Sequence, residues 1–275
     1  MSFTPQNRLK RRLKKVLTVL LLLYVMIGAS LYFLQEKLLF LPTVLSQDYQ
    51  YEFDSPYEEL FLKPAQDVSI NALHFKTKNP KGVILYFHGN AGDLSRWGTI
   101  AEYFVAKNYD VFIMDYRTYG KSTGKLSEQA FYEDAQYCYE YLLKQYSENE
   151  ITLYGRSLGT GIANYLASRN SPKQLILETP YFSILDVAKH RFPIFPIKKL
   201  MKYAFPSNAF IIDVKCPITI FHGTHDSVVP YASAEKLKNV APSELTTFIT
   251  IEGGGHNNLI EFEVYRNSIV DILGN

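Results

Sequence analysis

Apolar residues are distributed unevenly along this chain: one long apolar run near the N-terminus is followed by short apolar segments at regular intervals. The run from Val16 to Leu34 contains no charged residue. A helix of this length spans about 28 Å at 1.5 Å per residue, which is close to the hydrocarbon thickness of a bilayer. The pattern therefore predicts a transmembrane anchor over residues 16–34.

Two other interpretations of the N-terminal run are open. A cleaved signal peptide also has a basic start and an apolar middle, and Gly28-Ala29-Ser30 offers small residues for cleavage. Its apolar core is usually about 7–15 residues long, which is shorter than this run. A buried core helix is disfavoured because a strongly basic cluster directly precedes the run. The membrane anchor is the preferred interpretation.

Beyond Pro56 the apolar segments alternate between short strands and helices. The first two strands are close enough in sequence to form an antiparallel hairpin. The later strands are continuous apolar runs, which are typical of a mostly parallel sheet covered by helices on both faces. The sequence thus predicts an α/β fold with strands at residues 58–63, 68–76, 83–88, 111–116, 151–154, 175–178, 218–221 and 247–251, and helices at 94–107, 127–145, 160–169 and 257–273.

Residues 180–213 interrupt this alternation. They are rich in Phe, Pro and Lys and lie between two predicted strands. We interpret them as a small helical excursion that covers the site. An ordinary sheet-covering helix with long flanks is the alternative.

Charge is concentrated at the N-terminus. The chain has 29 Lys and Arg and 27 Asp and Glu, and six of the basic residues precede Val16. The remaining 23 basic and 27 acidic residues have a net charge of −4. The positive-inside rule then predicts a cytoplasmic tail at residues 1–15, a linker at 35–56, and a domain at 57–275 on the opposite side, periplasmic or extracellular in a bacterium. A nucleic-acid partner is disfavoured because such proteins spread positive charge over a folded face.

The two cysteines, Cys138 and Cys216, do not form a disulfide framework or a zinc-binding pattern. We expect two buried, unpaired thiols. A disulfide between them stays open, because the sequence does not show whether they are adjacent.

Residues 155–159, Gly-Arg-Ser-Leu-Gly, match the pattern G-x-S-x-G. In this pattern the serine occupies a sharp turn from a strand into a helix, so that its hydroxyl projects above the sheet. Gly155 and Gly159 would permit the strained backbone and the close approach of neighbouring chain. The match follows a predicted strand and precedes a predicted helix, which is the context that the pattern requires.

A serine hydroxyl needs a base to remove its proton, and the base needs a carboxylate that orients it. In folds with this elbow the chain order is serine, acid, histidine. Asp226 follows the strand predicted at 218–221, and His256 follows the strand at 247–251. The sequence therefore predicts Ser157 as nucleophile, His256 as general base and acid, and Asp226 as the orienting carboxylate.

Other residues of the same types have less favourable positions. Asp213 precedes its strand and would lie at the opposite end of the sheet. His225 is beside Asp226, but the base is expected from the final loop. His222 is expected to support the loop, and His190 is expected to be solvated.

The oxyanion of the tetrahedral intermediate needs preorganised donors, which are commonly two backbone N–H groups. We expect one from Leu158, directly after the nucleophile, and one from Asn90 in the loop after the strand at 83–88, with Ala91 as the alternative. His88 is expected to brace this loop. The proposed chemistry needs no metal and no organic cofactor.

Residues 57–275 resemble the α/β-hydrolase superfamily through YFHGNAGD, DYRTYGKSTG, YGRSLGTG, FHGTHDSVVP and GGGHNN, in that order. The motifs look like those of an N-terminally anchored branch related to the α/β-hydrolase-domain depalmitoylases and distantly to prolyl-oligopeptidase-type peptidases. Thr118 departs from this branch, which commonly has Gly there. The resemblance implies hydrolysis of esters or thioesters through an acyl-enzyme.

Two further functions are considered. The same three residues would serve a peptidase or amidase, but no group that binds a charged peptide terminus is identifiable. A non-catalytic, membrane-tethered binding protein on a hydrolase fold is disfavoured, because such proteins usually lose a member of the triad and here all three are present. The predicted partners are an acyl-ester or thioester substrate, which a lipid would fit, and the membrane.

Overall fold

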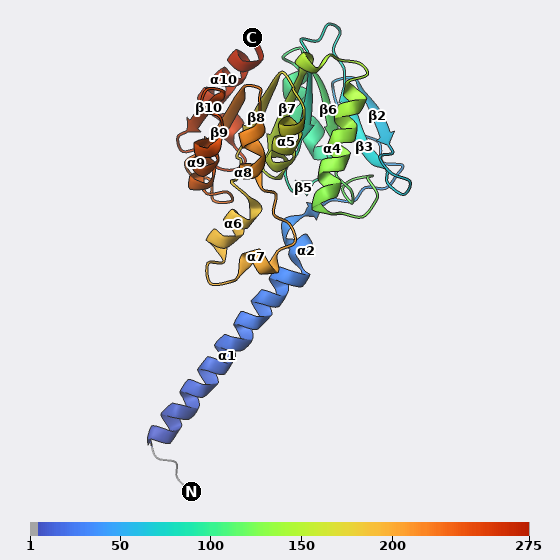
Figure 1. Ribbon diagram of the computed structural model, residues 1–275. Helices are drawn as coiled ribbons and strands as arrows, with labels where there is room; N and C mark the ends of the chain where they lie inside the picture. Colours follow the sequence, from blue (N-terminus) through green and yellow to red (C-terminus); the bar gives the residue numbers. More distant parts are fainter. Residues whose placement is uncertain (1–4, 275) are drawn as a thin grey trace.

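A computed structural model describes residues 5–274 and shows an α/β fold with one long helix that extends from it (Figure 1). The strands of the central sheet are β2 (Tyr57–Leu62), β3 (Ile70–Phe75), β4 (Val83–Phe87), β6 (Asp110–Met114), β7 (Ile151–Arg156), β8 (Gln174–Glu178), β9 (Ile218–Gly223) and β10 (Thr246–Ile251). Their order is β10-β9-β8-β7-β4-β6-β3-β2. All neighbouring pairs from β10 to β6 are parallel, and β3 is antiparallel to both β6 and β2. The predicted mostly parallel sheet and its antiparallel hairpin are confirmed.

Helices cover both faces of the sheet. Successive side chains of a strand point to opposite faces, so each face has its own apolar core. In β4, Val83, Leu85 and Phe87 belong to one buried cluster, whereas Ile84 and Tyr86 belong to the other. The first cluster packs under α4 (Glu128–Leu142), α5 (Leu158–Arg169) and α9 (Tyr231–Val240), and the second under α3 (Leu94–Val105) and α10 (Glu263–Gly274).

Two helices differ from the prediction. The last helix begins at Glu263 rather than at Asn257, after a 3₁₀ turn at Leu259–Glu261. The Asn258 side chain accepts a hydrogen bond from the Gly255 N–H at 2.8 Å, and this local bond holds the preceding residues in a loop. Helix α9 was not predicted, because half of its ten residues are polar and only Ala234 and Leu237 among its apolar residues are fully buried.

The structure gives local detail at one helix cap and at Thr118, and it confirms the expectation of two buried, unpaired thiols. Ser127 caps α4 by accepting a hydrogen bond from the Ala130 N–H at 3.1 Å. Cys138 and Cys216 are buried and unpaired, and burial raises the pKa of both thiols. Thr118 has φ of +76°, a left-handed conformation that glycine adopts without steric cost.

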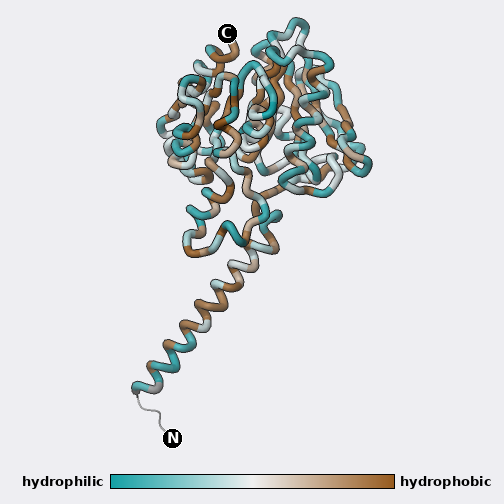
Figure 2. Tube along the Cα trace, viewed as in Figure 1, coloured by the Kyte–Doolittle hydropathy of each residue, from teal (hydrophilic) through white to brown (hydrophobic). Residues whose placement is uncertain are grey.

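The N-terminal helix α1 (Pro5–Phe33) continues from the basic segment through the apolar run without a break. Its stretch from Arg8 to Phe33 is long and apolar enough to cross a membrane, and its most apolar part is almost entirely exposed. Figure 2 shows that the part of this helix nearer the folded body is mostly hydrophobic, whereas its far end is hydrophilic. Residues 1–4 of the predicted tail lie outside the described residues.

The segment expected to act as a linker also packs on the body. After α2 (Gln35–Leu39), strand β1 (Leu41–Pro42) pairs in parallel with β5 (Ala91–Gly92), which belongs to the loop after β4. The residues at 35–42 therefore lie beside the loop that was predicted to hold an oxyanion donor.

Residues 180–213, which we call the cap, form the expected helical excursion. The cap contains α6 (Ile184–Arg191), α7 (Ile197–Leu200), α8 (Ser207–Phe210) and a 3₁₀ turn at Ile211–Asp213. In Figure 1, α6 and α7 lie between the sheet and the upper part of α1. The cap is therefore positioned between the carboxyl ends of the strands and the long helix.

Candidate active site

Ser157 lies between β7 and α5 with φ of +51° and ψ of −115°, a conformation that is strained for a residue other than glycine. Its N–H donates to the Glu178 carbonyl at 2.9 Å, which holds the turn against β8. The two nearby glycines leave no room for side chains. A Cβ atom on Gly155 would lie 2.6 Å from the Gly159 carbonyl oxygen, and one on Gly159 would meet the Phe87 carbonyl.

We expect Gly159→Ala to lower the free energy of unfolding by about 3 kcal/mol, because the added methyl group overlaps the backbone of a central strand. Gly274→Ala is the matched control, since a Cβ atom on that helical glycine would meet nothing within 4 Å. Urea denaturation followed by circular dichroism gives both values. Equal midpoints for Gly159→Ala and the wild type would contradict the expected overlap.

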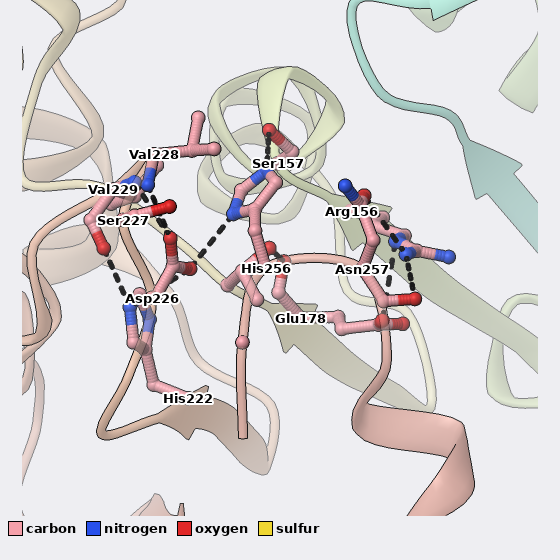
Figure 3. A network of polar contacts seen from close by, with 12 residues as sticks. Arg156, Ser157, Glu178, His222, Asp226, Ser227, Val228, Val229, His256 and Asn257 are labelled. Carbon is pink, nitrogen blue, oxygen red and sulfur yellow. Dashed lines mark hydrogen bonds and ion pairs between the residues drawn. The ribbon is translucent and has the colours of Figure 1, made fainter. Parts of the chain in front are cut away.

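The structure brings Ser157, Asp226 and His256 together from three separate loops at one edge of the sheet (Figure 3). His256 Nε2 is 2.8 Å from Ser157 Oγ, and His256 Nδ1 is 2.7 Å from Asp226 Oδ2. The imidazole thus lies between the hydroxyl and the carboxylate, with one nitrogen toward each. This arrangement suits proton transfer from the serine to a histidine whose other nitrogen donates to the acid.

Asp226 is almost completely buried and is held at both of its oxygens. Oδ1 accepts hydrogen bonds from the N–H groups of Val228 and Val229, each at 2.8 Å, and Oδ2 faces His256. Burial by itself raises the pKa of Asp226. The hydrogen bond and charge of His256, together with the Val229 N–H, lower the pKa by more than burial raises it, so the net pKa lies below the ordinary 3.8. The carboxylate is therefore ionised throughout the neutral range.

The other histidines occupy supporting or outer positions. His222 is buried, and its Nε2 donates to the Val229 carbonyl at 3.0 Å, which braces the Asp226 loop. Burial lowers the pKa of His222, which keeps it neutral. His190 is exposed at the end of α6, and the His225 N–H bonds to the Gly254 carbonyl. Asp213 is exposed in the 3₁₀ turn before β9.

Three hydrogen bonds hold the loop that contains Asn90. The Asn90 carbonyl accepts hydrogen bonds from the Leu41 N–H at 2.9 Å and from the Tyr119 hydroxyl at 2.8 Å. The Asn90 side chain donates to the Leu39 carbonyl at 3.0 Å. Within residues 5–274, the N–H groups of Asn90 and Leu158 donate to no protein acceptor. Both residues line the cavity that contains Ser157.

This cavity has a volume of about 540 Å³ and an apolar lining drawn from three parts of the chain. The body contributes Leu158 and Val228, the cap contributes residues of α6, and the N-terminal segment contributes Leu31, Leu38 and others. Arg191 is the single charged residue among the described residues that line it. The cavity can therefore hold an uncharged chain beside the Ser157 hydroxyl.

Comparison with known proteins places these features in a family. A family model described as serine aminopeptidase, S33 matches residues 78–210. The protein bem46 of Schizosaccharomyces pombe is 32% identical over 233 residues, which cover 81% of this chain and 78% of that protein. The chain belongs to the α/β-hydrolase superfamily. The resemblance stated from the sequence motifs is thus confirmed at this level.

Other relatives extend the comparison. Lysophosphatidylserine lipase ABHD12 of Macaca fascicularis is 30% identical to this α/β-hydrolase over 84% of the chain and 70% of that lipase. A protein of Mycobacterium tuberculosis is 32% identical over 64% of the chain, and the match spans 63% of that protein's length. The solved structure of Est1E from Butyrivibrio proteoclasticus has a TM-score of 0.65 at 18% identity, and the match covers 78% of this chain and 100% of that one. A Pyrococcus furiosus esterase also has a TM-score of 0.65, at 15% identity, and the match covers 86% of this chain and 97% of that one. Both structures show the shared fold.

One network in this α/β-hydrolase was missed by sequence reasoning. Arg156, between the motif glycine and Ser157, is 3.2 Å from Glu178 and donates to the Asn257 carbonyl at 3.2 Å (Figure 3). Glu178 also accepts a hydrogen bond from Tyr154 at 2.6 Å. The network ties the ends of β7 and β8 to the loop that carries His256. Its only sequence signal is a charged residue at a variable position of the serine motif.

Proposed function

We propose that this protein hydrolyses carboxylic esters or thioesters of long acyl chains through an acyl-enzyme on Ser157. The observation that carries the proposal is the Ser157–His256–Asp226 contact at the wall of an apolar cavity. The name of the relative ABHD12, a lysophosphatidylserine lipase, supports an ester with a lipid chain as substrate.

In the first half-reaction His256 Nε2 takes the Ser157 proton as Oγ attacks the substrate carbonyl carbon. The carbonyl oxygen becomes an oxyanion, for which the unused N–H groups of Leu158 and Asn90 are the proposed donors. Collapse of the intermediate breaks the bond to the leaving alcohol or thiol, which receives the proton from His256. Water then attacks the acyl-enzyme, gives a proton to His256, and releases the acid while Oγ is reprotonated.

The cavity lining favours an ester over a peptide substrate. An aminopeptidase needs an acidic group for the substrate ammonium, and none of the described residues that line the cavity is acidic. Each methylene group buried in an apolar site stabilises the complex by about 0.8 kcal/mol, roughly a fourfold gain in kcat/KM. A long chain is therefore the substrate that uses this cavity best.

The location is part of the proposal. Residues 16–34 are proposed as a transmembrane anchor, residues 1–15 as a cytoplasmic tail, residues 35–56 as a connection that also lines the cavity, and residues 57–275 as the hydrolase domain on the opposite side. The exposed apolar surface of α1 supports the anchor. The basic residues at its start support the orientation.

The test is covalent labelling with a fluorophosphonate, followed by mass spectrometry and a series of p-nitrophenyl esters from acetate to palmitate. We expect one label on Ser157 and a rise of kcat/KM with chain length. Ala188→Trp, in the cavity wall, should shift the preferred ester to a shorter chain, whereas Ala209→Trp, exposed on α8, should leave the profile unchanged.

The alternatives give different results in the same experiment. Faster turnover of aminoacyl p-nitroanilides than of any ester would favour the peptidase. A folded protein with neither label nor turnover would favour a non-catalytic binding protein.

A further inference from the structure

The tip of the cap, residues 192–197, lies directly against α1. The Phe195 ring stacks on the Tyr24 ring with centroids 4.6 Å apart and planes 9° from parallel. The Tyr24 hydroxyl donates to the Ile194 carbonyl at 3.4 Å. Leu31, Phe195 and Ile197 are buried in one apolar cluster that joins the helix to the cap. The cap tip and the middle of the apolar run are therefore at the same level along α1.

The contact at Tyr24 limits where the hydrocarbon layer can end along α1. If the hydrocarbon layer ended below the contact with Phe195, only residues 16–23 of the apolar run would remain inside it, a length of about 12 Å. A bilayer core is about 30 Å thick, so such a segment is too short to span it. An anchor that uses residues 16–34 must carry the cap tip into the lipid. This step rests on the proposed membrane anchor.

The chemistry of the cap tip suits a lipid environment. Its sequence, Phe-Pro-Ile-Phe-Pro-Ile, has no charged residue, and its two prolines have no N–H to satisfy. Three of the four N–H groups of this segment, those of Phe192, Phe195 and Ile197, donate to carbonyls at 2.8, 3.1 and 2.8 Å within the cap. Irregular backbone is tolerated in hydrocarbon only where its polar groups are satisfied by the protein. Ile194 points outward with 73% of its surface exposed.

Basic side chains flank the tip on both sides. Between residues 184 and 203 there are five Lys and Arg and one acidic residue, Asp186, although acidic residues outnumber basic ones in the rest of the chain after residue 15. The long basic side chains can extend from an immersed segment to the phosphate level of the bilayer. The exposed basic residues are Lys189, Arg191, Lys198, Lys199 and Lys202.

We propose that the cap tip is inserted into the phospholipid leaflet on the side of the folded body, as a second membrane contact beside α1. Leu31 of the anchor, Leu38 of α2, and Phe192 and Met201 of the cap line the same cavity as Ser157. An acyl chain therefore passes from the leaflet between α1 and the cap tip to Ser157 without crossing water.

The test places an environment-sensitive nitrobenzoxadiazole label at Ile194→Cys in the full chain, reconstituted into phosphatidylcholine–phosphatidylglycerol vesicles that contain acyl-chain doxyl lipid as quencher. The native cysteines are buried, which confines labelling to the new thiol. Leu20→Cys in the middle of α1 reports the anchor, and Val264→Cys on α10 is the exposed control on the body. We expect strong quenching at positions 20 and 194 and none at 264.

Quenching at position 20 without quenching at 194 would overturn cap insertion and leave the anchor standing. No quenching at either position would overturn both. Equal quenching at 194 and 264 would also overturn cap insertion. Fluorophosphonate labelling of Ser157 in the same samples reports the proposed hydrolase function separately from either result.

A second variant tests the route to Ser157. Ile194 does not line the cavity, so Ile194→Glu should leave turnover of soluble p-nitrophenyl butyrate unchanged. The same change should lower hydrolysis of a long-chain ester embedded in vesicles on the order of tenfold, because a carboxylate resists insertion into hydrocarbon. Equal hydrolysis of the embedded ester by variant and wild type would overturn the proposed route.

Discussion

Ser157→Ala is expected to lower kcat for p-nitrophenyl butyrate on the order of 10⁶-fold, with urea denaturation unchanged. The hydroxyl is 2.8 Å from the His256 imidazole, and no other nucleophile occupies that position among the described residues that line the cavity. Under the proposed mechanism its removal abolishes the acyl-enzyme, and the turnover left would come from water bound beside the proposed oxyanion donors. Steady-state kinetics on purified protein measures the loss.

Ser168→Ala is the matched control for this change. Ser168 lies on α5, the helix that Ser157 begins, and its hydroxyl bonds only to the Tyr165 carbonyl among the described residues. Its kcat should stay within about twofold of the wild type, since the change is remote from the cavity. A Ser157→Ala enzyme that retained a tenth of the wild-type kcat would contradict the role of Ser157 as nucleophile.

Asp226→Asn is expected to lower kcat by about 10⁴-fold with little change in the free energy of unfolding. The N–H groups of Val228 and Val229 hold one side-chain oxygen of Asp226, so the amide oxygen of an asparagine would stay there. The amide NH₂ group would then face His256 Nδ1 and force the imidazole proton onto Nε2. In this tautomer Nε2 is unable to accept the Ser157 proton.

Asp213, the other candidate acid considered from the sequence, provides the control for Asp226. Asp213 is exposed in the turn before β9, so Asp213→Asn should leave kcat unchanged. Asp226 should stay ionised at pH 5, because its pKa is lowered below 3.8, so protonation of this carboxyl should not reduce the wild-type rate at that pH. Comparable kcat for Asp226→Asn and Asp213→Asn would refute the assigned acid.

The arrangement of the candidate site was largely predictable because its residues follow strands. Apolar runs such as residues 83–87 are long enough and bounded clearly enough to be recognised as buried strands. The carboxyl ends of parallel strands lie at one edge of a sheet, so residues after β7, β9 and β10 converge there. The G-x-S-x-G pattern supplied the remaining constraint, a serine on a strained turn.

Contacts between distant segments were not predictable in the same way. The Arg156–Glu178–Asn257 network joins three loops, and none of these residues has a pattern that names its partners. Helix α9 buries only Ala234 and Leu237 of its apolar side chains, and these pack on the sheet that the rest of the chain forms. Tertiary packing, rather than local preference, decides such elements.

The sequence by itself determined the α/β architecture, the long apolar helix and the loops that carry Ser157, Asp226 and His256, because each depends on local periodicity or on a short motif. Only the tertiary structure decided that α1, α2 and the cap form one cavity wall around Ser157. Leu31, Leu38 and Phe192 are far apart along the chain, and only folding brings them together. The shape of the cavity is a property of that packing, whereas the candidate catalytic groups are encoded locally.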